Sequence, residues 1–227
     1  MVFESKIISQ REIASGTHEV TFERPPSPFV FEAGQYMQVA ISKLTKSDVK
    51  GPSRIFSIAS SPGEFETLSV VFRISDSGFK ETLRGMSAGS IVTLEQASGS
   101  FLLPQTLTRP QVFIAGGVGI APFMSYLLQN AQVEWRHPIS LVYGNQSTES
   151  TAYLHELKQM AVQQRQFSFE EVYELPTTEL FVRLSTNHPG AVWWVVGPPR
   201  MVDLAVGGLQ AGGISSEDIR TESFDGY

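Results

Sequence analysis

The sequence predicts two domains of β and α/β class: a six-stranded antiparallel β-barrel over residues 1–108, then a doubly wound parallel sheet with helices over residues 109–227. Two observations lead to this division. Up to Thr108 the chain reads as short alternating strands separated by turn residues, whereas beyond it apolar runs alternate with helix-like segments. With 227 residues, 41% of them hydrophobic and 18% charged, the chain can form two small globular domains that each bury a core.

The first domain is expected to contain one short helix and six strands. Phe79 and Leu83 lie four residues apart, which indicates a helix near residues 78–84. Glycines at the strand edges supply the permissive backbone that tight turns need. The expected strands lie near residues 3–14, 18–24, 35–42, 55–59, 66–73 and 91–97.

The second domain is expected to alternate strands and helices. Such alternation is typical of a parallel sheet with helical crossovers. Pro122 fits the start of a helix, because a proline there gives up a donor that would be unpaired anyway. The expected strands are 111–115, 139–143, 167–173, 191–196 and 219–224, and the other expected helices are 151–162 and 199–209.

Composition excludes several classes of function. The chain has no cysteine, so it supplies no disulfide, thiolate zinc site or iron–sulfur cluster ligand, and its four histidines show no metal-ligand spacing. The net charge of −6 argues against nucleic-acid binding. No apolar run is long enough for a membrane span, and the N-terminus lacks the pattern of a signal peptide, so a cytoplasmic location is expected.

Positive charge is concentrated in one stretch, which contains Lys43, Lys46, Lys50 and Arg54. It is interpreted as a solvated loop, with a site for a phosphate or an acidic partner as the alternative.

A glycine-rich segment, residues 115–122 (Ala-Gly-Gly-Val-Gly-Ile-Ala-Pro), lies between an expected strand and an expected helix. Residues without side chains let backbone N–H groups approach a pyrophosphate, and the helix N-terminus adds partial positive charge. Glycines also serve close packing, and the spacing differs from the usual dinucleotide fingerprint. A second turn, Gly197-Pro198-Pro199, follows the strand that ends at Val196, where ligands of α/β sheets bind.

The barrel contributes the run Arg54-Ile55-Phe56-Ser57, which offers a cation, an aromatic ring and a hydroxyl. Because side chains alternate along a strand, Arg54 and Phe56 should share one face while Ser57 turns to the other.

Taken in order along the chain, these motifs resemble the ferredoxin–NADP reductase superfamily. Weaker matches agree with this resemblance, namely Gly34-Gln35-Tyr36, Val71-Phe72-Arg73, Gly99-Ser100-Phe101 and Glu222-Ser223-Phe224. The resemblance covers essentially the whole chain. It implies a flavin-binding barrel and a nicotinamide-nucleotide-binding α/β domain, with FAD favoured over FMN and with NADH or NADPH as co-substrate.

For the flavin, the resemblance implies that Arg54 pairs with the pyrophosphate and that Phe56, in place of a common tyrosine, packs on the ring. Ser57 would lie near the flavin N5, and Glu222 near Ser57, to balance protons. Phe224 would cover the ring, with Tyr227 as the alternative. The implied catalytic residues are thus Ser57, Glu222 and Phe224. At the helix start that receives the flavin phosphates, the serine or threonine usual in the family is not cleanly placed, so Lys80 or the backbone is expected to substitute for it. The remaining residues implied at the flavin are Ile55, Val71, Phe72, Arg73, Gly78, Phe79, Lys80, Glu81 and Thr82.

For the nicotinamide nucleotide, two substitutions remove polar groups: Ala121 replaces a frequent threonine and Val196 a frequent cysteine. No arginine stands beside residues 145–147 (Asn-Gln-Ser) or Glu174, and a 2′-phosphate normally needs one, so NADH is favoured. The implied binding residues are Gly117, Gly119, Ala121, Pro122, Gly197, Pro198 and Pro199.

The function expected from the resemblance is hydride transfer from NAD(P)H to flavin N5, with onward electron transfer to an unidentified protein or small-molecule acceptor. The first alternative is a reductase that uses free flavin as a substrate, which the missing hydroxyl at Phe56 favours. A non-catalytic flavin- or nucleotide-binding module is the second, because Ala121 and Val196 lack polar groups. The third is a subunit that docks in a complex through residues 43–54.

Overall fold

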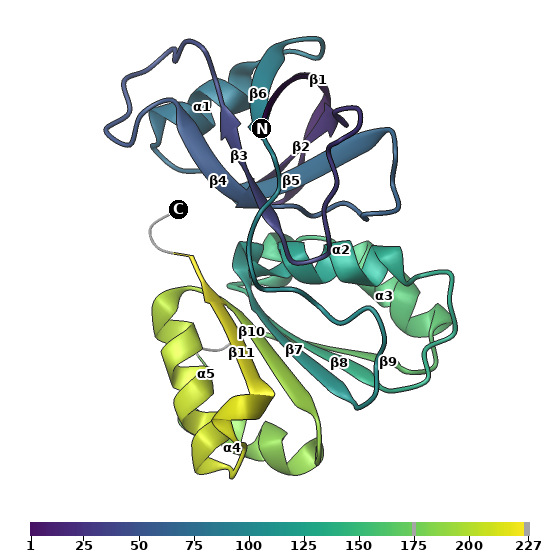
Figure 1. The fold of residues 1–227 in the computed structure, drawn as a ribbon. Coiled ribbons are helices and arrows are strands. Elements are labelled where there is room, and N and C mark those ends of the chain that lie inside the picture. Colours follow the sequence, from purple (N-terminus) through teal and green to yellow (C-terminus); the bar gives the residue numbers. More distant parts are fainter. Residues whose placement is uncertain (174–175, 225–227) are drawn as a thin grey trace. The chain divides into compact units, whose positions relative to one another are not determined.

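The computed structural model describes residues 1–173 and 176–224 (Figure 1). By its internal contacts the chain divides into two compact units. Unit 1 comprises residues 1–103 and 121–129, and unit 2 comprises residues 104–120 and the described residues from 130 onward. The boundary predicted at Thr108 falls inside a stretch that groups with unit 2, and it stays a prediction.

Unit 1 contains six strands and two helices. The strands are β1 (Val2–Ala14), β2 (Thr17–Glu23), β3 (Tyr36–Ala40), β4 (Ser53–Ser57), β5 (Thr67–Arg73) and β6 (Ile91–Glu95). The helices are α1 (Gly78–Gly85) and α2 (Ala121–Gln129). Helix α2 is joined to the barrel by the Ser125 hydroxyl, which donates to the Ser60 carbonyl at 2.7 Å.

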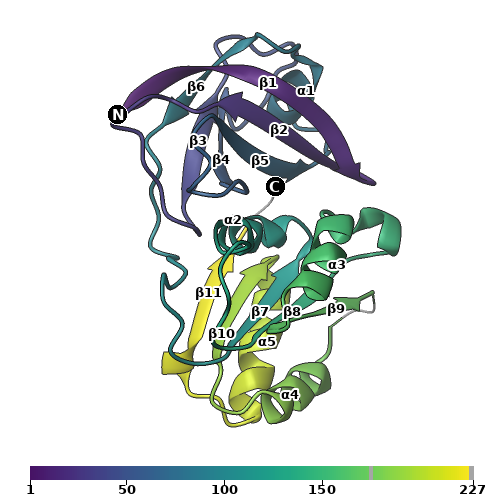
Figure 2. The ribbon, with the colours of Figure 1, turned by 90° about the vertical axis from the view of Figure 1, so that its right-hand side faces the viewer.

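The six strands of unit 1 form a closed antiparallel barrel in the order β4-β3-β6-β1-β2-β5. The long strand β1 pairs with both β2 and β6 and curves around the barrel (Figure 2). The two edge strands meet just beyond β4, where Ile58 bridges Val70 and the Ala59 N–H donates to the Ser69 carbonyl at 2.8 Å. The interior is filled by alternate residues of the strands, among them Val20, Phe22, Met37, Val39, Leu68, Val70, Val92 and Leu94.

Unit 2 is a five-stranded parallel sheet in the order β11-β10-β7-β8-β9. Its strands are β7 (Gln111–Gly116), β8 (Ile139–Gly144), β9 (Phe167–Val172), β10 (Val192–Gly197) and β11 (Ile219–Ser223). Its helices are α3 (Leu154–Gln163), α4 (Thr178–Asn187) and α5 (Pro199–Ala211). The 3-10 turns are η1 (Gly117–Ile120), η2 (Thr148–Ser150) and η3 (Ser216–Asp218). Helices α4 and α5 lie on one side of the sheet and α3 on the other (Figure 1), so the predicted fold class is confirmed.

The sequence analysis missed one element, helix α4, between the third and fourth strands of unit 2. Its signals are local: the Thr177 side chain accepts the Leu180 N–H as an N-cap, and Glu179 lies in the first turn. Phe181, Leu184 and Ser185 are its buried residues, and only the first two are apolar. The other helices and strands lie within three residues of their predicted bounds.

No helix among the described residues has the length and apolar character that a membrane crossing requires. The longest of them, α5, has 13 residues, against about 20 for a typical span. The cytoplasmic location expected from the sequence stays a prediction.

Two adjacent glycines in α5 provide a matched test of the packing between α4 and α5. A Cβ at Gly208 would lie 2.6 Å from the Phe181 Cβ and 2.9 Å from the Thr178 carbonyl oxygen, whereas a Cβ at Gly207 would meet nothing within 4 Å. We expect Gly208→Ala to lower the free energy of unfolding by about 1–3 kcal/mol, because the helices must separate. Gly207→Ala should raise it by about 0.5–1 kcal/mol through helix propensity. Denaturant unfolding measures both, and equal effects would contradict this packing.

Candidate functional site

Strand β4 carries Arg54 and Phe56 at alternate positions, which agrees with the prediction that they share one face. Both side chains are buried, and Ser57 is buried as well, whereas Ile55 between Arg54 and Phe56 is exposed. The Arg54 guanidinium lies 5.3 Å from the centre of the Phe79 ring, and the Phe56 ring packs against Phe72 at 5.7 Å. The proposed packing of Phe56 on a flavin stays a prediction, since its observed neighbours belong to the barrel core.

The start of helix α1 lies beside Arg54. Ser77 is the N-cap residue, and its side chain accepts the Lys80 N–H, so a hydroxyl is present at the helix start after all. A Cβ at Gly78 would lie 2.5 Å from the Lys46 carbonyl oxygen, which explains why this position needs glycine. Thr82 donates its hydroxyl to the Gly78 carbonyl at 2.7 Å, and exposed Glu81 pairs with Lys46 at 2.8 Å.

The sequence analysis missed Asp48, whose carboxylate caps this helix. Asp48 Oδ2 accepts the Phe79 N–H at 3.0 Å and the Ser77 hydroxyl at 2.6 Å, while Oδ1 forms a short ion pair with Arg54. The hydrogen bonds from Phe79 and Ser77 are the main reason that the pKa of Asp48 lies far below its ordinary value. The signal in the sequence is that Asp48 is the single acid within the basic stretch of residues 43–54.

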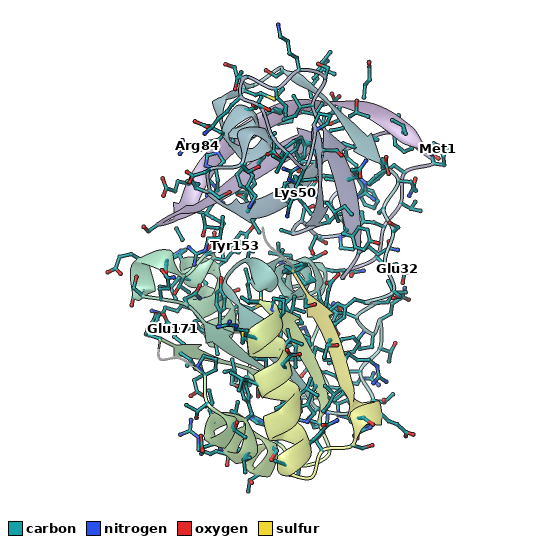
Figure 3. All side chains as sticks on the ribbon, turned by 90° about the vertical axis from the view of Figure 1, so that its left-hand side faces the viewer. Met1, Glu32, Lys50, Arg84, Tyr153 and Glu171 are labelled. Carbon is teal, nitrogen blue, oxygen red and sulfur yellow. The ribbon has the colours of Figure 1, made fainter. Side chains whose placement is uncertain are left out.

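Lys80 is buried on the same helix, with 2% of its surface exposed. Its ammonium has no hydrogen-bond partner, and it lies 6.0 Å from the centre of the Phe72 ring. Burial, followed by the charges of Arg54 and Lys50, lowers the pKa of Lys80 to about 8. The side chain lines a cavity of about 270 Å³ together with Phe72, Asp76 and Arg84. Figure 3 labels Arg84 of this lining and Lys50, whose charge acts on Lys80.

The segment Val71-Phe72-Arg73 lies at the end of β5. Val71 and Phe72 are buried, and Arg73 donates to the Ser15 carbonyl at 3.1 Å. Only Phe72 of the three lines the cavity beside Lys80.

In unit 2 the predicted nucleotide loop lies at the carboxyl edge of the parallel sheet. The turn η1 follows β7, with Gly117 in the left-handed region at a φ of +54°. The Tyr143 hydroxyl donates to the Gly117 carbonyl at 3.0 Å and so fixes this turn against β8. Ala121 and Pro122 then begin α2. Ligands of open α/β sheets bind at this edge.

Close packing accounts for three of the glycines in these loops. A Cβ at Gly119 would lie 2.4 Å from the Val196 carbonyl oxygen, so only glycine lets η1 approach β10. A Cβ at Gly116 or Gly197 would lie 2.5 Å from the side chain of Met201 in α5. The packing role that the sequence left open is therefore present. Pro198 is the N-cap of α5 and Pro199 its first residue.

Three further residues lie at the same edge. Asn145 follows β8, donates its N–H to the Val172 carbonyl at 2.9 Å, and has both side-chain amide atoms buried without a partner. Glu222 pairs in register with Val196, and burial raises its pKa to about 7. Phe224 follows β11, and its N–H donates to the Gly197 carbonyl at 3.1 Å.

Buried polar atoms without hydrogen-bond partners are concentrated at the predicted site residues. Among the described residues there are seven such side-chain atoms, and five of them belong to Ser57, Lys80, Asn145 and Glu222. The other two are in His18 and Trp193. A buried polar group normally has a partner, because leaving it without one costs free energy.

Comparisons with known proteins agree with this arrangement. The family model "Oxidoreductase NAD-binding domain" matches residues 113–206. The reductase component of propane 2-monooxygenase from Rhodococcus jostii is 27% identical over 88% of this chain and 57% of that protein. A probable flavin reductase from Vibrio harveyi is 28% identical over 70% of this chain and 68% of that protein. A ferredoxin NADP+ reductase from Neisseria gonorrhoeae, solved with bound FAD and NADP, superimposes with a TM-score of 0.79 at 22% identity over 98% of both chains.

The chain resembles the ferredoxin–NADP reductase superfamily, and residues 113–206 match an oxidoreductase NAD-binding domain. The relatives are named as reductases, and the matched model is an oxidoreductase domain, which agrees with the predicted class of flavin-dependent NAD(P)H oxidoreductase. The likeness to the solved structure shows the fold alone, and the chain spans 57% of the length of the Rhodococcus relative.

Several predicted roles in this superfamily site stay predictions. Ser57 belongs to unit 1 and Glu222 to unit 2, and the approach expected between them is such a prediction. Tyr227, the alternative flavin cover, and Glu174, used to argue for NADH, lie outside the described residues.

The unpartnered ammonium of Lys80 predicts a pH-dependent stability. The folded pKa of about 8 lies below the ordinary 10.5, so between these values the unfolded chain binds more protons and stability rises with pH. Without added flavin, Lys80→Met should therefore raise the free energy of unfolding at pH 7 by on the order of 2–3 kcal/mol. The gain should shrink as the pH approaches 10.5.

Thermal unfolding across this pH range measures the effect of Lys80→Met. The control is Lys46→Met, since Lys46 is exposed and paired with Glu81, and we expect it to change stability little. A loss of stability in Lys80→Met at pH 7 would mean that the ammonium is paired.

Proposed function

We propose that this chain takes a hydride from NADH, passes it to a flavin bound by unit 1, and releases the electrons to a separate acceptor. The flavin supplies the redox chemistry, with its N5 accepting the hydride of the nicotinamide C4. The protein supplies binding, orientation and proton handling.

The observation that carries this proposal is the set of unpartnered buried atoms in Ser57, Lys80, Asn145 and Glu222. Each belongs to a residue that the sequence singled out near a cofactor. A hydroxyl, an ammonium, an amide and a carboxyl without partners are groups that a polar ligand can pair with. The chemistry of these donors and acceptors therefore fits the flavin and the nicotinamide nucleotide.

The residues of unit 1 fit a flavin that carries a phosphate. Arg54, the Ser77 hydroxyl and the Phe79 N–H of α1 converge on one carboxylate, that of Asp48, which is the chemistry that also binds phosphate. Lys80 adds a second buried cation on the same helix. In this proposal the phosphate end of the flavin lies in this region beside Lys80, and Ser57 lies near its ring.

The residues of unit 2 fit NADH better than NADPH. A cavity of about 550 Å³ at the end of β9 is lined by Glu170, Glu171 and Glu179, with Arg183 as the only cation among its described lining residues. Arg183 lies 3.9 Å from Glu170, and Glu171, labelled in Figure 3, pairs with Lys158 at 3.3 Å. Such an acidic surface repels a 2′-phosphate, which supports the choice of NADH.

The acceptor is proposed to be a separate protein or a small molecule. The Rhodococcus relative is the reductase component of a monooxygenase, which supports a protein acceptor. The 227 residues contain no cysteine, so the electrons leave the flavin without a cluster held by these residues.

A second candidate is a reductase that uses free flavin as its substrate. The observation that favours it is the ion pair of Arg54 with Asp48, because the cation expected to anchor the flavin phosphate already has an anion. The Vibrio relative bears the name of a probable flavin reductase, which is consistent with this candidate.

The test of the proposed function is anaerobic mixing of the purified protein and FAD with NADH, followed by NADPH in a parallel sample. We expect the visible flavin absorbance to be lost, with NADH giving the larger kcat/KM. A yellow protein after purification supports a bound cofactor, and a colourless one that needs added flavin supports the second candidate. Flavin that stays oxidised over minutes with both nucleotides would overturn the proposal.

Glu222 is proposed to accept the proton that is released as electrons leave the flavin. Since burial raises its pKa to about 7, the carboxylate is ionised above this pH, and electron release should become faster as the pH rises through 7. Glu222→Gln should remove this pH dependence and slow the step roughly 100-fold, a typical contribution of a positioned base.

Stopped-flow reoxidation of the reduced protein measures the step assigned to Glu222. Glu217→Gln is the control, because Glu217 is an exposed glutamate on η3. A pH profile that Glu222→Gln leaves intact would show that this carboxyl does not handle the proton.

A further inference from the structure

The anion site beside Arg54 is already filled by a group of the protein itself. The Asp48 side chain is 4% exposed and the Arg54 side chain 6%. The carboxylate accepts hydrogen bonds from Phe79 N–H, the Ser77 hydroxyl and Lys50 N–H, at 3.0, 2.6 and 2.9 Å, in addition to its ion pair with Arg54. These donors are of the kind that would otherwise receive a phosphate group.

Both terminal nitrogens of the Arg54 guanidinium are already engaged within the described residues. Its Nη1 donates to three backbone carbonyls, those of Lys50, Gly51 and Ser53, at 3.2, 3.1 and 2.6 Å. Its Nη2 serves the Asp48 carboxylate and the Ser77 hydroxyl. A phosphate can therefore reach this fork only if Asp48 leaves it.

The loop that carries Asp48 contacts α1 through residues 45–47, which directly precede Asp48. Thr45 N–H donates to the Thr82 hydroxyl at 3.0 Å, and Lys46 pairs with Glu81. Gly78 has no Cβ that would push away the carbonyls of residues 46 and 47. The position of Asp48 is thus built into the sequences of both the loop and the helix.

Lys80 is a second buried cation in this region, and no described carboxylate forms an ion pair with it. Its buried ammonium has no hydrogen-bond partner, and Asp48 is bound to Arg54 and not to Lys80. The cavity that Lys80 lines, about 270 Å³, offers space for a ligand group next to it. An anion that binds in this region can pair with Lys80, whereas Arg54 is already neutralised by Asp48.

We propose that Asp48 is a built-in competitor of the flavin phosphate and thereby determines how strongly the protein selects phosphorylated flavins. While Asp48 holds Arg54, recognition rests on the flavin ring and on Lys80, and the flavin exchanges readily. This inference rests on the proposed function, since it presupposes that a flavin binds to unit 1.

Competition follows from charge and geometry. One guanidinium fork serves one planar anion well, and a phosphate placed beside the Asp48 carboxylate would be repelled by it. Because its hydrogen bonds hold the pKa of Asp48 far below the ordinary value, protonation does not relieve this repulsion near neutral pH. The other groups that face Asp48 are Arg54, Ser77 and the backbone of Lys50 and Phe79, none of which supplies a second acid.

The experiment compares the affinities of riboflavin and FMN, which differ only in the phosphate, by quenching of flavin fluorescence. In Asp48→Asn the amide oxygen can still accept the Ser77 and Phe79 hydrogens, but the charge that neutralises Arg54 is gone. We expect FMN to bind roughly tenfold more tightly or better, the scale of one charge-assisted hydrogen bond, while riboflavin changes little. Glu4→Gln is the control for loss of a negative charge, because Glu4 is an exposed carboxylate on β1 that neither bonds to Arg54 nor lines the cavity beside Lys80.

A double variant keeps the test decisive if the single change disturbs folding. Asp48→Asn with Arg54→Met removes the ion pair as a whole, which buried sites often tolerate. The preference for FMN over riboflavin should then equal that of the unaltered protein, and a clear fall would show that Arg54 binds phosphate with Asp48 in place. An unchanged preference in a folded Asp48→Asn protein, or a weakened one, would also overturn the competition. If neither flavin binds to the unaltered protein, the proposed function fails instead.

Discussion

Arg54 brings a permanent positive charge into the wall of the barrel, where its side chain is 6% exposed, and such a charge must be paired. Much of the site in unit 1 follows from this requirement. Asp48 reaches Arg54 because its loop is tied to α1 and because Gly78 leaves room for the loop backbone. The same carboxylate caps α1, so one side chain neutralises the cation and completes the helix. Any flavin phosphate would therefore enter a region in which Arg54 is already paired with Asp48.

Unit 2 is constrained by backbone proximity more than by charge. The turn η1 lies so close to β10 that a Cβ at Gly119 would overlap the Val196 carbonyl, and Gly116 and Gly197 face the side chain of Met201. These contacts bring the two glycine turns together at the carboxyl edge of the sheet. Asn145 and Glu222 lie at that edge with atoms that have no partner. The glycines thus serve packing first, and packing creates the edge at which a nucleotide is proposed to bind.

The two units differ in the kinds of buried polar groups that have no hydrogen-bond partner. Unit 1 offers an ammonium in Lys80 and a hydroxyl in Ser57, while unit 2 offers an amide in Asn145 and a carboxyl in Glu222. The cation suits a phosphate, and the neutral and acidic groups suit a ribose or a proton. This division supports a flavin in one unit and a nicotinamide nucleotide in the other.

The sequence by itself determined the alternation of strands and helices, and with it the barrel, the parallel sheet and the resemblance to the superfamily. It also placed Arg54, Ser57, Lys80 and Glu222 among the candidates, because strand periodicity and motif order are local properties of the chain. It missed α4, whose cap and two buried apolar residues form a weak signal within a short segment. Asp48 was missed for a different reason. Its pairing with Arg54 across six positions, and with Ser77 and Phe79 across about thirty, depends on a loop folding back onto a helix. Only the tertiary structure could decide this, since charge pairing between distant segments leaves no periodic trace in a single sequence.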